Sequence, residues 1–430
     1  MPYFHDQVLM RENGSASVIL VFPSGSQFAR SNLRALAASR MLALFCTTIA
    51  WRGSPRVLDM LPRSVRDLLR ARVFDEVEGR LIRCFPLREI LNRIAHKTGV
   101  PLLTTHEVGW ASSDGVSRAL DEAVARLIRR RKVRASAIYG YDYAALRSLE
   151  AAAEVGMRRF YELPIGYWRA GQRILGEEGE LNPAWAMTIE SLRDSPAKHE
   201  RKDAELRLAE HIVVPSEFVR ETLTEHPGLT ASVDVIPYGA PVPRALALER
   251  RRSPKLRLLY VGHLSQRKGI SYLFAAMRRL AGAASLTLVG PRIGASCHAL
   301  TEELARHTWL GAVPHGRVLE IMAEHDVLVF PSLFEGLAQV ILEAQAQGLP
   351  VITTRNSGGR AVIDEGSNGF IVPIRDPDAI AERVTALAAD RDRLEAMSRA
   401  ALLKAGELSW AAREAVFIAM MRARLGAAPR

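Results

Sequence analysis

The stretch DVLVFPSLFEGLAQVILEAQAQGLPVITT, residues 326–354, decides the fold that this sequence predicts. It opens on a short, continuous, β-branched run, DVLVFPS, which is typical of a strand buried on both faces of a parallel sheet. After a loop, Leu337, Val340, Ile341 and Ala344 have the spacing of a helix that starts near Gly336 and packs on the sheet. PVITT, 350–354, gives the next strand. This unit indicates an α/β fold with a parallel sheet.

The same alternation extends in both directions and predicts two similar α/β domains. The opening unit is a strand at 17–22, the loop PSGS and a helical pattern over 29–44. A Pro-rich, charged segment near 240–254 interrupts the alternation, so the 430 residues divide there. We predict an N-terminal domain over 1–240, a C-terminal domain over 241–404 and terminal helices over 405–430. The other predicted strands are 101–105, 135–141, 158–163, 211–216, 232–239, 256–262 and 285–290.

Composition argues against a disordered protein, against a disulfide or zinc framework and against a membrane-spanning protein. Hydrophobic residues are 48% and charged residues 24%, which is ordinary globular usage. Three scattered cysteines, Cys46, Cys84 and Cys297, lack CxxC or metal-ligand spacing, so we predict core thiols in a reducing compartment. Acidic residues near the N-terminus and the lack of a long apolar stretch predict a cytoplasmic protein, soluble or bound at the inner face of a membrane.

The positive charge is concentrated in the first third of the chain. Residues 1–134 hold 22 Lys and Arg against 12 Asp and Glu, a net charge of +10 out of +11. These basic residues are dispersed and follow no nucleic-acid-binding motif, so we expect no nucleic-acid partner. Neither first βα turn reads GxGxxG, which argues against a nicotinamide dehydrogenase.

Two motifs fall at the carboxyl ends of strands in the C-terminal half. The amides that follow Gly336 offer a seat for phosphate at a helix start, Glu335 stands at the lip of the loop, and Glu343 lies deeper along the helix. LLYVGHLSQRKGI, 258–270, presents Arg267 and Lys268 at the same edge, where they could neutralise a diphosphate. Alternatively, Glu335 complements the helix dipole, Glu343 is solvated and Lys268 is an exposed turn residue.

These motifs together resemble glycosyltransferase family 4, retaining enzymes of GT-B fold that use nucleotide sugars. The resemblance is carried by VGHLSQRKG, FEGLAQVILEAQAQGLPVI with its two glutamates seven residues apart, HIVVPSEFVRETL and NSGGRAVIDEGSNGFIVPIRDPDAIAE. It covers the chain from about residue 205, while 1–200 is similar only in outline. It implies two Rossmann-like domains facing across a cleft, terminal helices that cross back to the first domain, and no metal or other cofactor besides the nucleoside diphosphate sugar.

The resemblance also implies individual roles. Lys268 and Glu335 would be catalytic: Lys268 would stabilise charge on the departing diphosphate, and Glu335 would contact sugar hydroxyls. Glu343 would hold the ribose hydroxyls. The remaining donor-binding residues would be Gly25, His263, Arg267, Val313, Gly336, Leu337 and Ala338.

Two positions depart from the family pattern. His263 stands where members usually have Arg, and its charge at neutral pH is only partial. The strand end where many members place a histidine offers Tyr141 and Asp142, so we name no histidine base. A retaining mechanism does not need one, because the resemblance implies that the donor phosphate takes the acceptor proton.

Weaker candidates lie in the N-terminal half. His106 and Glu107 follow a predicted strand and could border the acceptor cleft, or be structural. Tyr167, Trp168 and Arg169 could stack on a sugar, or pack in the core. The basic run at 129–134 could contact an anionic lipid or acidic acceptor, or simply be solvated.

The function predicted from the sequence is transfer of a sugar from a nucleoside diphosphate to a hydroxyl of a saccharide or lipid-linked acceptor, in polysaccharide or glycoconjugate biosynthesis. The alternative is a catalytically impaired nucleotide-sugar-binding or assembly protein of the same fold. The basic N-terminal domain points to an anionic membrane surface as a partner.

Overall fold

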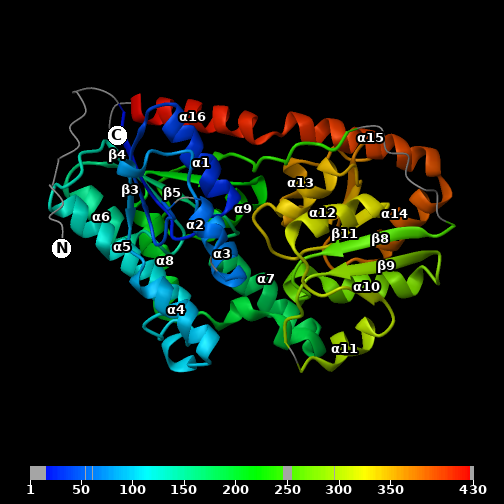
Figure 1. Ribbon diagram of the computed structural model, residues 1–430. Coiled ribbons are helices and arrows are strands. Elements are labelled where there is room, and N and C mark those ends of the chain that lie inside the picture. The colour runs from blue at the N-terminus through cyan, green and yellow to red at the C-terminus, as the bar shows by residue number, and fades with distance from the viewer. Residues whose placement is uncertain (1–15, 54, 61, 246–253, 295, 427–430) are drawn as a thin grey trace.

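The computed structural model describes residues 16–53, 55–60, 62–245, 254–294 and 296–426, which form two all-parallel β-sheets (Figure 1). The first sheet has seven strands in the order β3-β2-β1-β4-β5-β6-β7, and the second has six in the order β10-β9-β8-β11-β12-β13. The predicted fold class is therefore confirmed. The strands of the first sheet are β1 (Val18–Val21), β2 (Leu42–Thr47), β3 (Ile82–Cys84), β4 (Ala137–Tyr141), β5 (Arg158–Glu162), β6 (His211–Val214) and β7 (Ser232–Val235).

In the second sheet the chain order reverses between two central strands. The chain first forms β8, β9 and β10, each at the outer side of the strand before it. It then returns to the centre of the sheet, where β11 pairs with the other side of β8. Such a switch point leaves a crevice beyond the carboxyl ends of the two central strands, where open α/β sheets bind ligands. The strands of this sheet are β8 (Leu256–Val261), β9 (Ala284–Val289), β10 (Thr308–Trp309), β11 (Val327–Phe330), β12 (Val351–Thr354) and β13 (Gly369–Val372).

Helices connect successive strands and cover the sheets. In the first half they are α1 (Gln27–Ala38), α2 (Pro55–Asp59), α3 (Arg63–Arg70), α4 (Leu87–Thr98), α5 (Ser113–Arg129), α6 (Leu146–Glu154), α7 (Trp168–Leu181), α8 (Pro196–Leu208) and α9 (Glu217–Thr222). In the second half they are α10 (Ile270–Arg279), α11 (His298–Leu304), α12 (His315–Glu324), α13 (Gln339–Ala346), α14 (Pro377–Ala389), α15 (Arg391–Glu407) and α16 (Trp410–Gly426).

Three local predictions were wrong. The predicted strand at 101–105 is a 3₁₀ turn, Pro101–Leu103, followed by turns. The predicted helix over 29–44 ends at Ala38, because Arg40 adopts a positive φ of 58° and the chain turns into β2. The helix expected to start near Gly336 is α13, which begins only at Gln339.

The last two helices span both halves of the molecule (Figure 1). α15 packs on α13, and α16 packs on α1 in the first half. Phe417 of α16 is fully buried, with its ring 5.4 Å from the ring of Tyr139. Arg413 donates to Asn32 Oδ1 at 2.7 Å within the same core. The helix α16 thus contributes to the N-terminal hydrophobic core.

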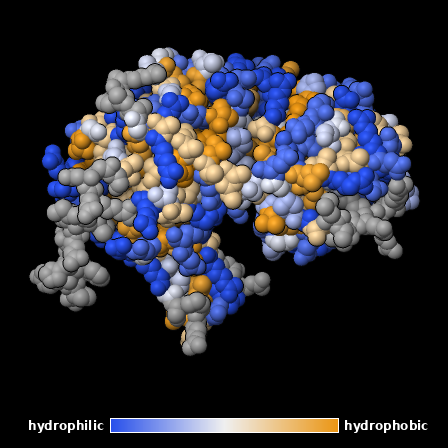
Figure 2. Space-filling view, turned by 90° about the horizontal axis from the view of Figure 1, so that it is seen from above, coloured by the Kyte–Doolittle hydropathy of each residue, from blue (hydrophilic) through white to orange (hydrophobic). Residues whose placement is uncertain are grey.

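The segment over 165–200, which sequence patterns did not place, joins the two halves. α7 leads into a 3₁₀ helix, Pro183–Thr188, whose Trp185 is buried in the core of the second half, with its ring 5.9 Å from that of Phe274. Seen from above, the molecule is hollowed between its halves (Figure 2). No helix among the described residues is both long and apolar enough to span a bilayer.

Candidate active site

Two loops meet at the switch point of the second sheet. The loop after β8 contains a short 3₁₀ helix, Gln266–Lys268, and the loop after β11 carries Glu335. Arg267 Nη1 donates to Glu335 Oε1 at 2.7 Å and to the Phe334 carbonyl at 2.9 Å. Lys268 Nζ forms an ion pair with the same Glu335 oxygen. Fold topology therefore brings together a carboxylate and two cations that are 67 and 68 residues distant from it in sequence.

This group is largely withdrawn from water. The exposed fractions of the side chains are 12% for Glu335, 13% for Lys268 and 22% for Arg267. Burial raises the pKa of Glu335, but Lys268 and Arg267 outweigh it and hold that pKa below its ordinary value. Burial lowers the pKa of Lys268, and Glu335 only partly opposes this. The group has one positive charge in excess when all three side chains are ionised, which suits an anion.

The loop that carries Glu335 is seated against the first half of the chain. A Cβ atom added to Gly336 would overlap the Pro164 carbonyl oxygen, so only glycine fits there. Ser216 Oγ donates to the Gly336 carbonyl at 2.6 Å, and the Gly166 amide donates to the Glu335 carbonyl at 3.3 Å. These contacts hold the Glu335 backbone at the junction of the two halves.

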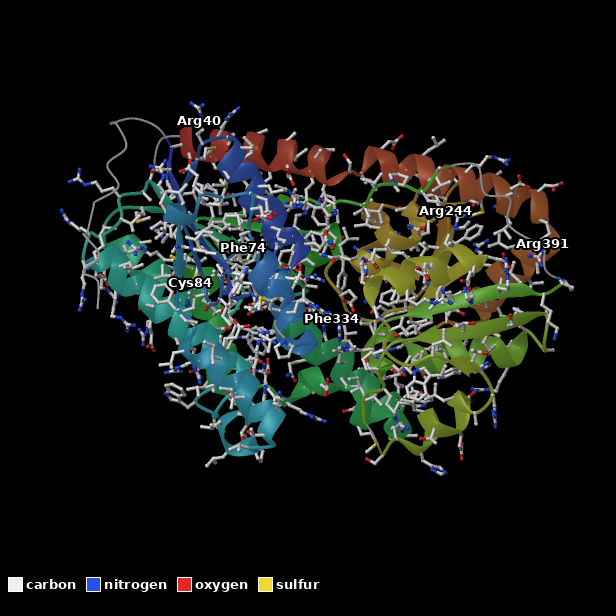
Figure 3. The ribbon with its side chains drawn as sticks, in the orientation of Figure 1. Arg40, Phe74, Cys84, Arg244, Phe334 and Arg391 are labelled. Atoms are coloured by element: carbon white, nitrogen blue, oxygen red, sulfur yellow. The ribbon has the colours of Figure 1, made fainter. Side chains whose placement is uncertain are left out.

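Phe334, which precedes Glu335, lies at the same junction (Figure 3). Its ring centroid is 5.8 Å from that of Phe218 in the first half, and a Cβ atom on Gly171 would come within 3.1 Å of it. The aromatic contact adds to the hydrogen bonds that fix this loop.

One of the predicted amide donors already has a partner. The Ala338 amide donates to the Ser357 carbonyl at 3.0 Å, so it is paired within the second half, and its contact with the donor stays a prediction. Leu337 is buried in the core of the second half. Because α13 starts at Gln339, Gly336 and Leu337 form the approach to the helix and not its first turn.

Glu343 and His263 are close in sequence to Glu335 and Arg267, but each side chain has a different local environment. The Glu343 carboxylate is 20% exposed, on α13, with Oε1 3.9 Å from His315 Nδ1. Burial raises its pKa, and His315 opposes the rise. His263 has a lowered pKa because of burial and of the nearby Lys268 and Arg267, so its ring is neutral at pH 7. Arg267 and Lys268 are therefore the cations that the switch point offers to an anion.

Gly25 and Val313 lie in two other loops. Gly25 follows β1, and a Cβ atom there would lie 2.6 Å from the Ala71 carbonyl oxygen. Glycine is thus required by packing within the first half, whatever else approaches it. Val313 is partly buried against the core of the second half, after β10.

The expected residues at the end of β4 do not face the cleft freely. Tyr141 is 2% exposed and accepts a hydrogen bond from Asn32 Nδ2 at 2.7 Å, inside the N-terminal core. Asp142 accepts from the Tyr161 hydroxyl at 2.8 Å and lies 3.6 Å from Lys202 Nζ. Tyr141 is therefore a structural residue.

Tyr167, Trp168 and Arg169 converge on one carboxylate, that of Asp203. The Tyr167 hydroxyl and the Trp168 indole each donate to Asp203 Oδ1 at 2.6 Å, and Arg169 Nη2 donates to Oδ2 at 2.8 Å. The Trp168 ring is stacked on His199, with 4.0 Å between centroids. The Trp168 ring is thus covered by His199 and by the Arg169 guanidinium, 4.3 Å from its centroid, in line with the structural alternative.

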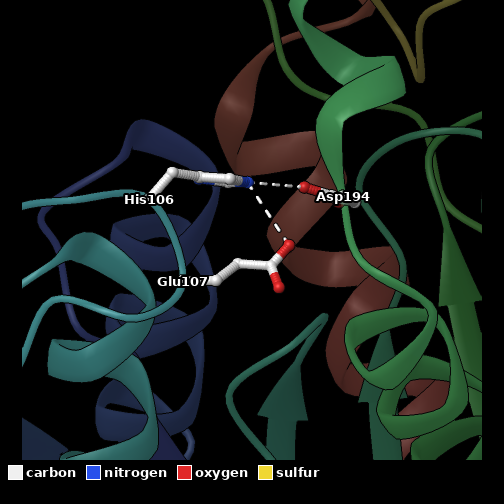
Figure 4. A group of neighbouring side chains, drawn as sticks. All are labelled: His106, Glu107 and Asp194. Atoms are coloured by element: carbon white, nitrogen blue, oxygen red, sulfur yellow. Dashed lines mark hydrogen bonds and ion pairs between the residues drawn. The ribbon is translucent and has the colours of Figure 1, made fainter.

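His106 and Glu107 form a cluster with Asp194 (Figure 4). His106 Nε2 lies 3.1 Å from Asp194 Oδ1 and 3.4 Å from Glu107 Oε1. Lys198 Nζ pairs with the cluster, 2.8 Å from Asp194 and 3.0 Å from Asp114. Glu107 also accepts a hydrogen bond from the Ser195 amide at 2.8 Å. The cluster ties the loop before α5 to the start of α8.

A buried residue that sequence patterns missed supports the loop of Arg267 and Lys268. Glu178 of α7 is fully buried and accepts hydrogen bonds from Gln266 Nε2 at 2.7 Å and Arg375 Nε at 2.7 Å. Tyr272 also donates to it, at 3.0 Å. The surrounding sequence LGEEGEL resembles a solvated helix face, so no sequence signal distinguishes Glu178 from its neighbours.

A groove of about 350 Å³ runs between the halves, beside α7 and α9. Arg355, after β12, pairs with Glu221 of α9 across it. Arg375, after β13, pairs with Glu177 of α7 at 2.9 Å. Ion pairs therefore connect the two halves on either side of this groove.

Comparison with known proteins agrees with this geometry. Residues 255–390 match the family model described as "Glycosyl transferases group 1". Glycogen synthase of Mycobacterium tuberculosis is 27% identical over 284 residues, which cover 63% of this chain and 64% of the relative, less than two thirds of its length. Sucrose-phosphate synthase from Thermosynechococcus elongatus has a TM-score of 0.66 at 17% identity, over 96% of this chain and 100% of that structure.

Anabaena HepE in complex with UDP-glucose has a TM-score of 0.59 at 14% identity, over 95% of this chain and 100% of that structure. At these identities the two solved structures establish the fold alone. The family match over residues 255–390 agrees with the motifs and with the two-sheet architecture, so this part of the chain is similar to the group 1 glycosyl transferases (glycosyltransferase family 4), and the chain has the GT-B fold.

Proposed function

We propose that this chain is a retaining glycosyltransferase that transfers a sugar, of hexose type, from a nucleoside diphosphate to a hydroxyl group of an acceptor. The observation that carries the proposal is the group formed by Arg267, Lys268 and Glu335 at the switch point of the second sheet. Two largely buried cations can receive the diphosphate, and the carboxylate that they share can accept hydrogen bonds from sugar hydroxyls.

The chemistry follows from the charge of this group. As the bond between sugar and phosphate breaks, negative charge grows on the leaving diphosphate, and Lys268 and Arg267 stabilise it where little water competes. Glu343, on the helix that follows, would accept hydrogen bonds from the ribose. We expect full activity in EDTA, because Arg267 and Lys268 supply positive charge to the diphosphate in place of a metal ion.

The acceptor is a saccharide or a lipid-linked saccharide that enters from the N-terminal half. The support is the charge of residues 1–134, which carry +10 of the total +11 and lie apart from the donor group. An anionic membrane surface at the cytoplasmic side is the proposed partner of this half.

The experiment that tests the proposal combines donor binding with product detection. Melting is recorded with UDP, GDP, ADP and their glucose conjugates, since a ligand that binds the native state raises the melting temperature. The best donor is then incubated with candidate acceptors, and its slow hydrolysis is measured alongside. Binding with neither transfer nor hydrolysis would support a binding protein instead, and no shift with any nucleotide would refute both functions.

A further inference from the structure

An unusual set of apolar side chains is exposed on α4 and the segment after it. Of the 18 large apolar side chains that are exposed in the described part of the chain, seven lie between residues 87 and 110. Three of them, Leu87, Ile90 and Ile94, share one face of α4, at spacings of three and four residues. The other four, Val100, Leu102, Val108 and Trp110, follow in the segment before α5, and Leu102 is 81% exposed.

Contacts join the segment that follows α4 to α4 itself, so these side chains belong to one region of the surface. The Val100 amide donates to the Ala95 carbonyl at 2.9 Å. Asn92 Nδ2 donates to the Ala111 carbonyl at 2.7 Å. The Arg88 guanidinium lies over the Trp110 ring, 4.7 Å from its centroid. We call this region the α4 surface; it comprises Leu87, Ile90, Ile94, Val100, Leu102, Val108 and Trp110.

Within the stretch of chain that carries the α4 surface, the exposed Lys, Arg, Asp and Glu side chains are all cations. Between residues 83 and 110, the exposed charged side chains of Lys and Arg are those of Arg83, Arg93 and Lys97. Both carboxylates of the same stretch are withdrawn into the protein: Glu89 is buried, and Glu107 is 14% exposed. Exposed apolar side chains bordered by cations, with no exposed carboxylate in this stretch, match the composition of a surface that binds anionic lipids.

The position of the α4 surface connects it with the proposed reaction. α4 begins at Leu87, just after β3 ends at Cys84, and therefore starts at the carboxyl edge of the first sheet. α4 and its following segment form the lower projection of the first half (Figure 1). A lipid-linked acceptor in a bilayer that touched this projection would have its head group near the edge where the halves face each other.

We propose that the α4 surface docks on an anionic bilayer, with its apolar side chains at the boundary of head groups and acyl chains and its cations against lipid phosphates. The biological purpose of this docking rests on the proposed function, but the docking itself does not require sugar transfer. The other basic region, the run at 129–134, has no large apolar side chain exposed within it, so electrostatics alone would act there.

The test uses the full chain and sedimentation with phosphatidylcholine vesicles, with or without phosphatidylglycerol. We expect binding to the anionic vesicles only, weakened by salt. Leu102→Ser with Val108→Ser should lower the partition coefficient by about tenfold or more, because each apolar side chain gains on the order of 1 kcal/mol or more on burial. The matched control, Leu403→Ser on α15, removes a side chain that is 64% exposed elsewhere and should leave binding unchanged.

Three results would overturn the proposal: wild-type protein that ignores anionic vesicles, a double variant that binds like wild type, or loss of binding in Arg130→Glu with Arg131→Glu alone. A wild-type dimer that the double variant converts to monomer, measured by light scattering, would instead assign this surface to a second copy of the chain. Circular dichroism confirms folding, and UDP binding by the variants separates a failure of docking from a failure of the proposed function.

Discussion

Changing the two partners of the buried ion pair should move nucleotide affinity in opposite directions. In Lys268→Ala, one of two cations that face the diphosphate is lost, and Arg267 and Glu335 are left as a neutral pair. In Glu335→Gln, both cations remain and the competing carboxylate is gone. The first variant should bind UDP more weakly than wild type, and the second more tightly, although both should lose transfer.

The expected changes in UDP affinity can be calculated from the charges at the site. A charge-assisted hydrogen bond contributes about 1.5 to 3 kcal/mol, so Lys268→Ala should weaken UDP binding by roughly 10- to 150-fold. If the phosphate charge binds roughly 6 Å from the Glu335 carboxylate, the two repel each other by about 3 kcal/mol at an effective dielectric constant of about 20. Part of this repulsion is already offset by the cations, so we expect Glu335→Gln to tighten UDP binding by about tenfold.

The pH dependence adds a second criterion. Burial already lowers the pKa of Lys268, and the Glu335 carboxylate only partly opposes this shift. Without that carboxylate the pKa of Lys268 falls further, so the gain in Glu335→Gln should be largest at a pH where wild-type Glu335 is ionised and Lys268 is charged, and should disappear as pH rises through the lowered pKa of Lys268. Wild-type protein should keep its affinity to a higher pH.

Isothermal titration calorimetry with UDP measures the affinities, and transfer or donor hydrolysis is followed separately. The matched control is Glu320→Gln, which removes a carboxylate that is 65% exposed on α12 and should change neither quantity. If Glu335→Gln weakened UDP binding as Lys268→Ala does, the electrostatic reasoning about this site would be wrong.

Three further changes test the packing and charge around the site. Gly336→Ala should abolish transfer and lower the melting temperature, because its Cβ would overlap a carbonyl of the opposite half, whereas Gly316→Ala, with open space around it, should melt like wild type. Phe417→Ala, at a fully buried position, should lower the free energy of unfolding by about 3 to 5 kcal/mol in urea titrations, against less than about 0.5 kcal/mol for Val416→Ala, which is 54% exposed. His263→Arg replaces a ring that is neutral at pH 7 by a permanent cation and should tighten UDP binding in calorimetry at pH 7.5; unchanged affinity would place residue 263 away from the diphosphate.

Much of the fold could be predicted from local patterns. The strands around Val327–Phe330 and Leu256–Val261 are continuous β-branched runs, and burial on both faces of a parallel sheet demands that composition. The strand β2 was missed because its sequence LALFCT continues the apolar pattern of α1, and periodicity cannot show where Arg40 turns the chain. The segment 101–105 has the composition of a strand, but it lies along α4 and pairs with no sheet.

The sequence by itself determined the residue types at the site, because a parallel α/β sheet brings the ends of all its strands to one edge. It therefore indicated that Lys268 and Glu335 share that edge. Only the tertiary structure decided that Glu178 supports their loop, that the Ala338 amide is taken by a carbonyl and that Tyr141 is buried. These facts depend largely on contacts between segments far apart in sequence, such as Gln266 with Glu178, 88 residues apart, and Arg375 with Glu178, 197 residues apart, and on which half of the chain covers which side chain. Local spacing carries no information about such long-range contacts, since they are fixed by how the two sheets and the bridging helix α7 pack together.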